Sequence, residues 1–132
     1  MDSPPHRFSF RVYYEDTDAG GIVYYANYLR FTERARTEFL RAQGIHQRAL
    51  AREEGLFFVV AQCQMHYIAP AYLEDWLEVT TTVNIKSSMR LVLQQDIFRN
   101  EDKIFTSLLT LACVNAHHKA CQFPEVFDKI CI

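Results

Sequence analysis

The stretch with the clearest chemical potential is DTDAGGIVYY, residues 16–25, in which two carboxylates precede two adjacent glycines and two adjacent tyrosines. A carboxylate such as that of Asp18 can activate water as a general base or attack a carbonyl carbon directly. Paired glycines let a loop turn tightly and let a ligand approach the backbone closely. Gly21, the second of the pair, is the glycine nearer to the two tyrosines in sequence. These residue types in this order indicate a site for chemistry on a carbonyl group.

The elements on either side decide where Asp18 lies. Residues 8–14, FSFRVYY, alternate at first between apolar and polar side chains and favour a strand. A helical period begins between Tyr25 and Asn27. Its apolar face is formed by Tyr28, Phe31, Ala35, Phe39 and Ala42. Residues 15–23 are therefore expected to form a loop that delivers Asp18 to the start of a helix.

A helix start next to Asp18 would complete the arrangement, because its first backbone N–H groups are unpaired and carry a partial positive charge. Such donors stabilise an oxygen that becomes negative during acyl transfer. The same sequence is also typical of a turn or a helix-capping loop without any catalytic role. Both interpretations follow from the residues alone, and Asp16 is interpreted as a turn former.

The rest of the chain is predicted to be mainly sheet. After a short helix at about residues 46–53, segments rich in β-forming residues predict antiparallel strands at 56–69, 76–85, 90–99 and 104–116. A strand, a long helix and several antiparallel strands in this order define the α+β class. We expect residues 1–132 to form a single domain, in which the antiparallel sheet wraps around the long central helix.

Composition excludes several classes of function. The 132-residue chain is 49% hydrophobic and 23% charged, and its formal net charge of −2 offers no overall attraction for nucleic acid. No apolar run is long enough to span a bilayer, and the start, MDSPPHRFSF, lacks the apolar core of a signal peptide. We therefore expect a cytoplasmic protein whose four cysteines are free thiols.

The segment VYYEDTDAGGIVYYANYLRFTERARTEFL, residues 12–40, resembles the hotdog-fold acyl-CoA thioesterases of the 4-hydroxybenzoyl-CoA thioesterase-like superfamily. Within that superfamily it is most similar to the branch associated with the Tol-Pal system. The shared pattern is a strand, D-x-D-A-G-G-[IV]-V-Y, and a helix with E-R-A-R-T-E. A second segment, YIAPAYLEDWLEV, resembles that branch's Y-x-x-P-A-x-x-x-D-x-L-x-V stretch, and the similarity covers most of residues 8–115.

This resemblance implies a hotdog domain that hydrolyses an acyl-CoA thioester. Asp18 would be the catalytic carboxylate, acting as nucleophile or as general base. The carbonyl oxygen would lie at the helix N-terminus near the backbone N–H of Tyr25, with Gly21 and Tyr24 beside the substrate. The resemblance further implies no metal or redox cofactor, with coenzyme A as part of the substrate. It also implies a site between the subunits of a dimer, often paired into a homotetramer.

Tyr25 departs from the pattern, because the Tol-Pal-associated branch usually has histidine at this place. Histidine titrates near neutrality, whereas a tyrosine hydroxyl stays protonated and only exchanges hydrogen bonds. The hydroxybenzoyl-CoA enzymes are similar to this chain in having tyrosine there. An aromatic or larger acyl group flanked by Tyr24 and Tyr25 is therefore an alternative to a short chain. The two tyrosines are otherwise interpreted as core aromatics.

The turn KSSMR, residues 86–90, is a candidate for binding the phosphates of coenzyme A. The side chains that would do so are Lys86, Ser87, Ser88 and Arg90. Solvated turn residues are the alternative.

The remaining histidines and cysteines have simpler interpretations. His117 and His118, with Cys121 nearby, are not expected to hold a metal, because adjacent side chains on an extended strand point opposite ways. His66 is interpreted as a core or interface residue. Cys63 lacks a recognisable partner base and is not expected to be a nucleophile.

Other functions compete with acyl-CoA hydrolysis. The thioester could be carried by an acyl carrier protein, and charge reversal in residues 86–90 would distinguish the two carriers. A hotdog protein that binds an acyl ligand without turnover belongs to a different class, against which the intact Asp18 argues. A hydratase of the same architecture is disfavoured, because no histidine-containing signature of that kind is present.

Overall fold

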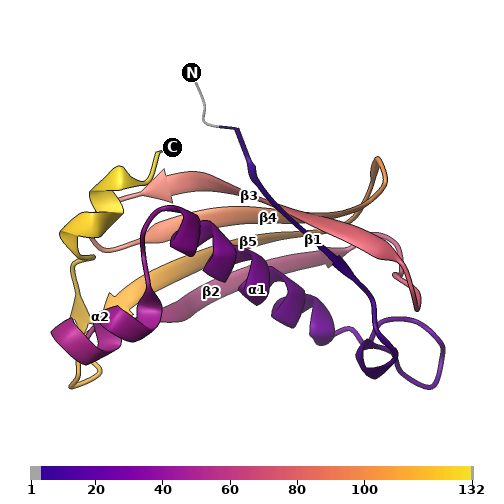
Figure 1. The fold of residues 1–132 in the computed structure, drawn as a ribbon, viewed down its shortest axis with the longest axis horizontal. Helices are drawn as coiled ribbons and strands as arrows, with labels where there is room; N and C mark the ends of the chain where they lie inside the picture. Colours follow the sequence, from indigo (N-terminus) through magenta and orange to yellow (C-terminus); the bar gives the residue numbers. More distant parts are fainter. Residues whose placement is uncertain (1–3, 132) are drawn as a thin grey trace.

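The computed structural model describes residues 4–131, with α1 lying across one face of a long antiparallel sheet (Figure 1). In chain order the elements are β1 (His6–Arg11), the 3₁₀ turn η1 (Tyr14–Asp16), α1 (Asn27–Ala42), α2 (Gln47–Glu54), β2 (Phe57–Tyr67), β3 (Trp76–Lys86), β4 (Leu91–Arg99), β5 (Asp102–Val114), β6 (Ala120–Cys121) and the 3₁₀ turn η2 (Glu125–Lys129). The predicted helices and the long strands are all present, and the α+β class is confirmed.

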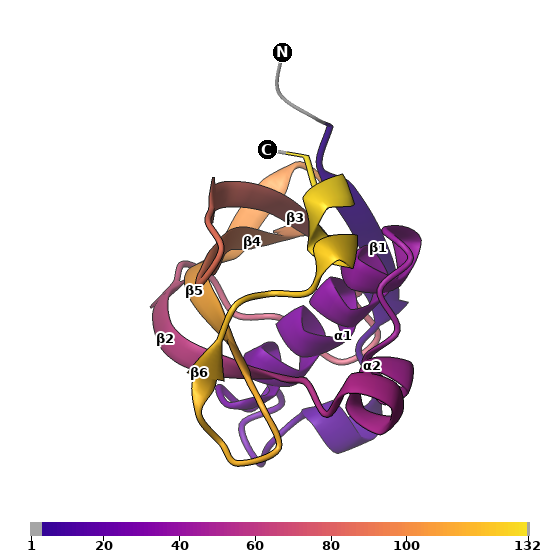
Figure 2. The ribbon, with the colours of Figure 1, turned by 90° about the vertical axis from the view of Figure 1, so that its left-hand side faces the viewer.

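The sheet has the strand order β1-β3-β4-β5-β2, with β6 paired to the end of β5. The register runs straight across its middle, where Phe8 lies opposite Val79, Val79 opposite Ile97 and Ile97 opposite Phe105. Figure 2 shows the sheet curving toward α1. Strands β1 and β2 are the two edges, so β2 offers one row of backbone groups to whatever lies beside it.

The core lies between the curved face of the sheet and one side of α1. Tyr28, Phe31 and Ala35 of the helix belong to one buried cluster with residues of β3, β4 and β5. Phe39 and Leu40 belong to a second cluster at the other end of the helix. Each buried ring or branched side chain contributes about 1.5–3 kcal/mol to folding. These contacts explain why α1 has apolar side chains at every third or fourth position.

The helix is covered on one side only within a single chain. Leu29 is 38% exposed, and Arg30, Glu33 and Arg34 are exposed as well. Ala42, predicted on the apolar face, is also exposed, because the buried stripe turns to Leu40 in the last turns.

The first strand ends earlier than the sequence pattern predicts. β1 stops at Arg11, and Tyr14 lies in the 3₁₀ turn η1. The carboxylate of Asp16 is the reason, because its Oδ2 accepts the backbone N–H of Tyr13 at 2.8 Å. The N–H of Thr17 then closes the turn on the carbonyl of Tyr14 at 3.1 Å.

Two irregularities change which side chains face the helix. In β3 the register shifts between Val83 and Ile85, so Ile85 is 44% exposed although the alternation predicts it on the same side as Leu77. In β2 the register shifts between Val60 and Gln62. One extra residue in a strand exchanges its two faces beyond that point.

The carboxyl-terminal segment adds elements that the sequence patterns did not predict. β6 pairs with β5, and η2 follows it. Phe127 of η2 is buried and packs against Phe58 of β2, with ring centroids 4.9 Å apart. The segment therefore closes the second core cluster. No helix of residues 4–131 is long and apolar enough to cross a membrane.

Candidate active site

Asp18 lies in a tight loop that the backbone itself holds closed. Thr17 and Val23 form an isolated antiparallel bridge across the base of the loop. The Asp18 N–H donates to the carbonyl of Ile22 at 3.0 Å, and the Gly21 N–H donates to the carbonyl of Asp18 at 3.0 Å. Gly21 has a φ of +81°, a conformation that L side chains rarely adopt, which explains the requirement for glycine.

The Asp18 carboxylate is exposed and oriented by one hydrogen bond. Its Oδ1 accepts the backbone N–H of Gly20 at 2.8 Å. A Cβ at Gly20 would lie 3.2 Å from that oxygen, so glycine also permits this close approach. Among residues 4–131 no donor contacts the second oxygen, Oδ2, which leaves it available to a substrate or a water.

The loop is attached to the start of α1 through Asp16. The carbonyl oxygen of Asp16 accepts the side-chain amide of Asn27, the first residue of α1, at 2.9 Å. It also accepts the backbone N–H of Tyr24 at 2.9 Å. Asp16 and Asn27 are both buried. The interpretation of Asp16 as a turn former is therefore correct, because its carboxylate accepts the backbone N–H of Tyr13 within the turn.

A second support comes from the segment before β3. Ile22 forms a bridge with Tyr72, and the Val23 N–H donates to the carbonyl of Ala71 at 2.9 Å. The hydroxyl of Tyr28 in turn accepts the N–H of Ala71 at 3.0 Å. Burial raises the pKa of Tyr28 above its usual value, so the hydroxyl stays protonated.

The backbone immediately before α1 carries a free donor, the N–H of Tyr25. The N-cap residue is Ala26, which has no side chain able to cap the helix. Among the described residues, no protein acceptor contacts the N–H of Tyr25. A helix start that lacks a side-chain cap leaves its positive end available to an external oxygen.

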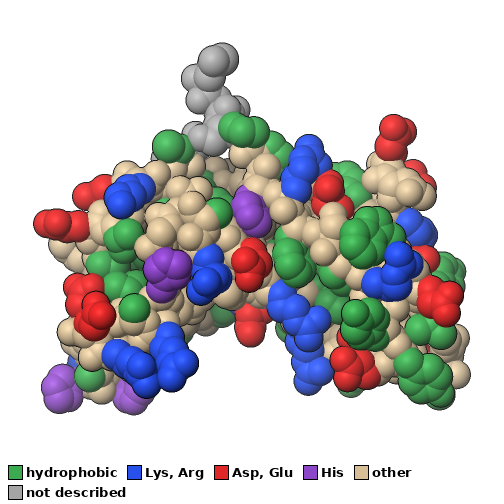
Figure 3. All heavy atoms as spheres, in the orientation of Figure 1, with side chains coloured by type: hydrophobic (Ala, Val, Ile, Leu, Met, Phe, Trp, Pro, Cys, Tyr) green, Lys and Arg blue, Asp and Glu red, His purple; other side chains and the backbone are tan. Residues whose placement is uncertain are grey.

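Aromatic side chains surround this end of the molecule. The hydroxyl of Tyr67 donates to the carbonyl of Tyr25 at 2.8 Å, and the two rings lie 6.4 Å apart. Tyr24 and Tyr25 are 45% and 64% exposed, with ring centroids 5.0 Å apart, so they are not core residues in a single chain. Figure 3 shows large hydrophobic side chains gathered at this end of the helix face.

Sequence reasoning missed three residues that support the site. Tyr67 and Tyr28 hold the helix start and the Ala71 segment, as described above. Arg99 donates to Asp75 and to the carbonyl of Pro70, each at 2.9 Å, and so fixes the segment that contacts Ile22. Tyr67 heads the Y-x-x-P-A stretch, which was the available signal for it. Arg99 had no such signal, because its partners are distant in sequence.

The candidate coenzyme A turn lies at the other end of the sheet. β3 starts near the Asp18 loop and runs its full length before Lys86, so one chain does not bring the two together. Lys86 donates to the carbonyls of Asp128 and Ile130 at 3.2 and 2.8 Å. Ser87 Oγ accepts the N–H of Arg90 within the turn. Coenzyme A binding by residues 86–90 remains a prediction, with Arg90 the exposed cation.

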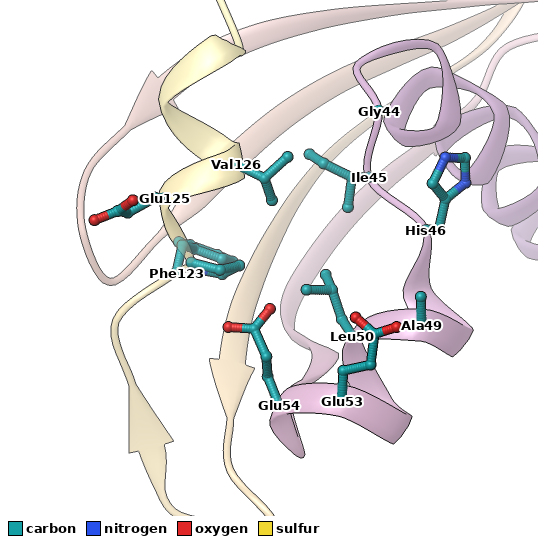
Figure 4. A pocket seen from close by; sticks show the side chains of 11 residues that line it. Gly44, Ile45, His46, Ala49, Leu50, Glu53, Glu54, Phe123, Glu125 and Val126 are labelled. Carbon is teal, nitrogen blue, oxygen red and sulfur yellow. The ribbon is translucent and has the colours of Figure 1, made fainter.

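Two hollows at that end are lined partly by carboxylates. One of about 540 Å³ is lined by Lys86 and Ser88 and also by Glu125 and Asp128. Another of about 640 Å³ lies between α2 and η2 (Figure 4). It is lined by Ile45, His46, Leu50, Glu53, Glu54, Phe123, Glu125 and Val126, among others. The carboxylates make neither hollow a natural phosphate site.

The other titratable candidates lie apart from Asp18. His117 and His118 are exposed in the turn between β5 and β6. Among residues 4–131 no group of three or more histidine, cysteine or acidic side chains is placed to hold a metal ion. Burial raises the pKa of the Cys63 thiol, which opposes nucleophilic use.

The loop, the helix start and the fold together define a class of protein. Residues 12–130 match the family model of the thioesterase-like superfamily, and the chain belongs to that family. The predicted membership of the hotdog thioesterases is confirmed.

Individual relatives narrow the similarity. The acyl-CoA thioesterase YbgC of Haemophilus influenzae is 42% identical over 119 residues, which are 89% of this chain and 88% of that protein. The acyl-CoA thioesterase YbgC of Helicobacter pylori strain 26695 is 34% identical over 130 residues, covering 91% and 95%. A probable thioesterase from Bartonella henselae superposes with a TM-score of 0.87 at 35% identity, covering 92% and 100%. These similarities are consistent with the Tol-Pal-associated branch.

Proposed function

We propose that this protein hydrolyses an acyl-CoA thioester to a free acid and coenzyme A. The observation that carries the proposal is the exposed Asp18 carboxylate, held by Gly20 in a loop whose base is attached to the start of α1. The relatives named as acyl-CoA thioesterases support the substrate class. Hydrolysis adds the elements of water across the carbonyl–sulfur bond, and no metal or redox group takes part in our proposal.

In the proposed reaction Asp18 acts on the thioester carbonyl carbon. As general base it removes a proton from an attacking water, and as nucleophile it attacks the carbon itself and forms an anhydride that water then opens. Either route places negative charge on the carbonyl oxygen. The free N–H of Tyr25 and the positive end of α1 are the groups that would stabilise this oxygen.

The acyl group is proposed to lie against the exposed aromatic rings. Tyr24 and Tyr25 offer flat surfaces at the mouth of the site, and Gly21 leaves space beside Asp18 because a Cβ there would meet no atom within 4 Å. Flat aromatic surfaces favour an aromatic or larger acyl group over a short one.

We further propose that two copies pair through β2. This edge strand exposes Phe57, Val59, Val60, Met65 and Tyr67, each by 40% or more. A long apolar edge is a template for pairing with another chain. Antiparallel pairing would extend the sheet, cover the open side of α1 and make that helix central. A homodimer, or two dimers in a homotetramer, acting in the cytoplasm is the assembly we expect.

Such pairing would bring residues 86–90 of one copy toward the Asp18 loop of the other. A two-fold axis at β2 reverses the partner's strands, so the partner's turn would lie at the same end as this chain's Asp18. Arg90, the exposed cation of the turn, is then the side chain proposed to meet the phosphates of coenzyme A. An acyl carrier protein would engage a wider surface at the same place.

The first experiment follows the loss of thioester absorbance with short-chain, long-chain and hydroxybenzoyl-CoA substrates. Wild type is compared with Asp18→Asn, and Asp102→Asn serves as the matched control because Asp102 is an exposed carboxylate at the first residue of β5. We expect Asp18→Asn to lose about 10²-fold or more in kcat, which is roughly 2.7 kcal/mol of barrier. Asp102→Asn should keep wild-type activity.

Two results would contradict the proposal. Wild type that is inert on every acyl-CoA would leave a carrier-bound thioester or a non-catalytic acyl binder as the function. Full activity in folded Asp18→Asn would remove the carboxylate from the mechanism.

Light scattering during size-exclusion chromatography tests the assembly, and a monomer at micromolar concentration would exclude β2 pairing.

A further inference from the structure

Cys113 and Cys121 face each other across β5 and β6, far from the Asp18 loop. Their register is direct, with Cys113 opposite Cys121 and Val114 opposite Ala120. The two Sγ atoms lie 3.6 Å apart, with the Cys121 thiol directed at the sulfur of Cys113. Both are free thiols, and Cys113 is fully buried while Cys121 is partly exposed.

The connecting turn holds this register. The side-chain carbonyl of Asn115 accepts the N–H groups of His117 and Lys119 at 2.9 and 3.1 Å. The Asn115 N–H donates to the carbonyl of Lys119 at 2.9 Å. His118 takes a φ of +60°, which turns the chain back on itself. The two thiols are therefore opposed by a defined turn and do not meet by chance contact of flexible ends.

We propose that Cys113 and Cys121 are an oxidation site, which forms a reversible intramolecular disulfide with a hydroperoxide as oxidant. Directly opposed residues of an antiparallel pair have Cα atoms about 4.5–5.5 Å apart, within the roughly 4.4–6.8 Å that a disulfide needs. The sulfurs must approach from 3.6 Å to about 2.05 Å, which rotation of the two side chains can supply. The backbone keeps its place.

The order of the two steps follows from exposure. Burial and the neighbouring Cys121 raise the pKa of the Cys113 thiol to about 12, so Cys113 stays protonated in the resting protein. The partly exposed Cys121 meets the oxidant first.

Each step balances. The Cys121 thiol loses its proton, and its sulfur attacks one peroxide oxygen. The O–O bond breaks, the released hydroxide takes up that proton and departs as water, and Cys121 becomes a sulfenic acid. The Cys113 sulfur then attacks the Cys121 sulfur, the S–O bond breaks and the leaving hydroxide takes the Cys113 proton as a second water. Two electrons pass from the two thiols to hydrogen peroxide.

The disulfide would fasten the carboxyl-terminal segment to the core. β6 has only two register pairs, and the segment after it carries Phe123 and Phe127, whose rings stack 4.3 Å apart. The Phe123 N–H donates to the carbonyl of Ser88 at 2.9 Å, so the same segment also supports the turn after β3. A covalent bond at Cys121 fixes the point where this segment leaves the sheet.

The test uses full-length protein with Cys63→Ser and Cys131→Ser, so that only the proposed pair remains. After hydrogen peroxide and quenching, alkylation in denaturant counts the free thiols, and intact mass shows whether two hydrogens are lost. We expect both thiols to disappear through a bond within each chain, without covalent links between chains, and the Tm to rise by about 5 °C. Dithiothreitol should restore both values.

A matched variant separates a disulfide from other oxidation. Adding Cys121→Ser to this background should abolish the intramolecular bond and the rise in Tm, while the reduced variant stays folded because this side chain is only partly buried. The proposal would be overturned if the thiols of Cys113 and Cys121 stay free under conditions that oxidise the exposed Cys131 of the wild-type protein. So would disulfides that link separate chains on a non-reducing gel. Thioesterase activity should be equal in the reduced and oxidised forms.

Discussion

The hydroxyl of Tyr67, the last residue of β2, donates a 2.8 Å hydrogen bond to the carbonyl oxygen of Tyr25, which lies just before α1. The bond joins the edge of the sheet to the helix start and limits rotation of the backbone at Tyr25. The ring of Tyr67 is meanwhile packed edge-on against Tyr28 and Phe105, with centroids 5.2 Å away in each case. The proposed donor for the carbonyl oxygen of the substrate is therefore positioned by a residue 42 places along the chain.

Tyr67→Phe removes this hydrogen bond and keeps the ring. A net loss of about 0.5–1.5 kcal/mol is typical of one such bond, so we expect kcat/KM to fall by about 2–13-fold. Tyr14→Phe is the control, since Tyr14 is 82% exposed. Steady-state kinetics on the preferred acyl-CoA makes the comparison, and equal values for Tyr67→Phe and wild type would show that the bond has no role in turnover.

Gly21→Ala and Gly44→Ala form a matched pair. The two glycines have φ of +81° and +82°, and an added Cβ meets no atom within 4 Å at either place. Each substitution should therefore cost about 1 kcal/mol of backbone strain in thermal or urea unfolding. Only Gly21 lies in the Asp18 loop, so we expect kcat to fall in Gly21→Ala alone. Parallel losses of activity in both variants would contradict a local role for Gly21.

Gln95 and Gln94 lie on opposite faces of β4. Gln95 is fully buried, and its amide donates to the carbonyl of Thr32 in α1 at 2.9 Å and to Thr81 in β3 at 3.0 Å. Gln95→Ala should lower the free energy of unfolding by about 2–4 kcal/mol, because it removes two buried hydrogen bonds and opens a cavity. Gln94→Ala on the opposite face should change it by about 0.5 kcal/mol or less. Urea denaturation measures both.

His6 should make stability depend on pH. Burial lowers the pKa of this imidazole, against a smaller opposing effect of Glu38, and the ring lies edge-on to Phe39 at 5.9 Å. Below its ordinary pKa of about 6.5, the unfolded chain binds the proton more readily than the folded one, so stability falls as the pH falls. His6→Gln should flatten the Tm between about pH 7.5 and pH 5. The exposed His117→Gln is the control, and an unchanged slope in His6→Gln would refute this assignment.

Local pattern was sufficient for α1 and for the long strands. The period of Tyr28, Phe31, Ala35 and Phe39 reflects one buried helix side, and β-forming runs between polar turns reflect the sheet. The end of β1 and the two register shifts were not predictable, since they depend on the Asp16 carboxylate and on one extra residue in β2 and β3. β6 was too short to show any period.

The candidate site was likewise predictable only where its geometry is local. The Asp18 loop was predictable because its geometry is local: glycines and an Asp side chain hold it within a few residues. Its supports, Tyr67 and Arg99, act on partners 42 and 24 or more residues away, which only the folded sheet brings near. The position of residues 86–90 relative to Asp18 was also beyond local pattern, because it depends on the direction and length of β3.

The closure of the Asp18 loop by backbone hydrogen bonds has an evolutionary consequence. Ile22, Tyr24 and Tyr25 are exposed, and the bonds that fix the loop near them use main-chain atoms of Asp18, Ile22 and Val23. Substitutions at these three side chains can therefore accumulate with little penalty in folding. A lineage could exchange one acyl preference for another through such changes, while the fold and the carboxylate are inherited intact.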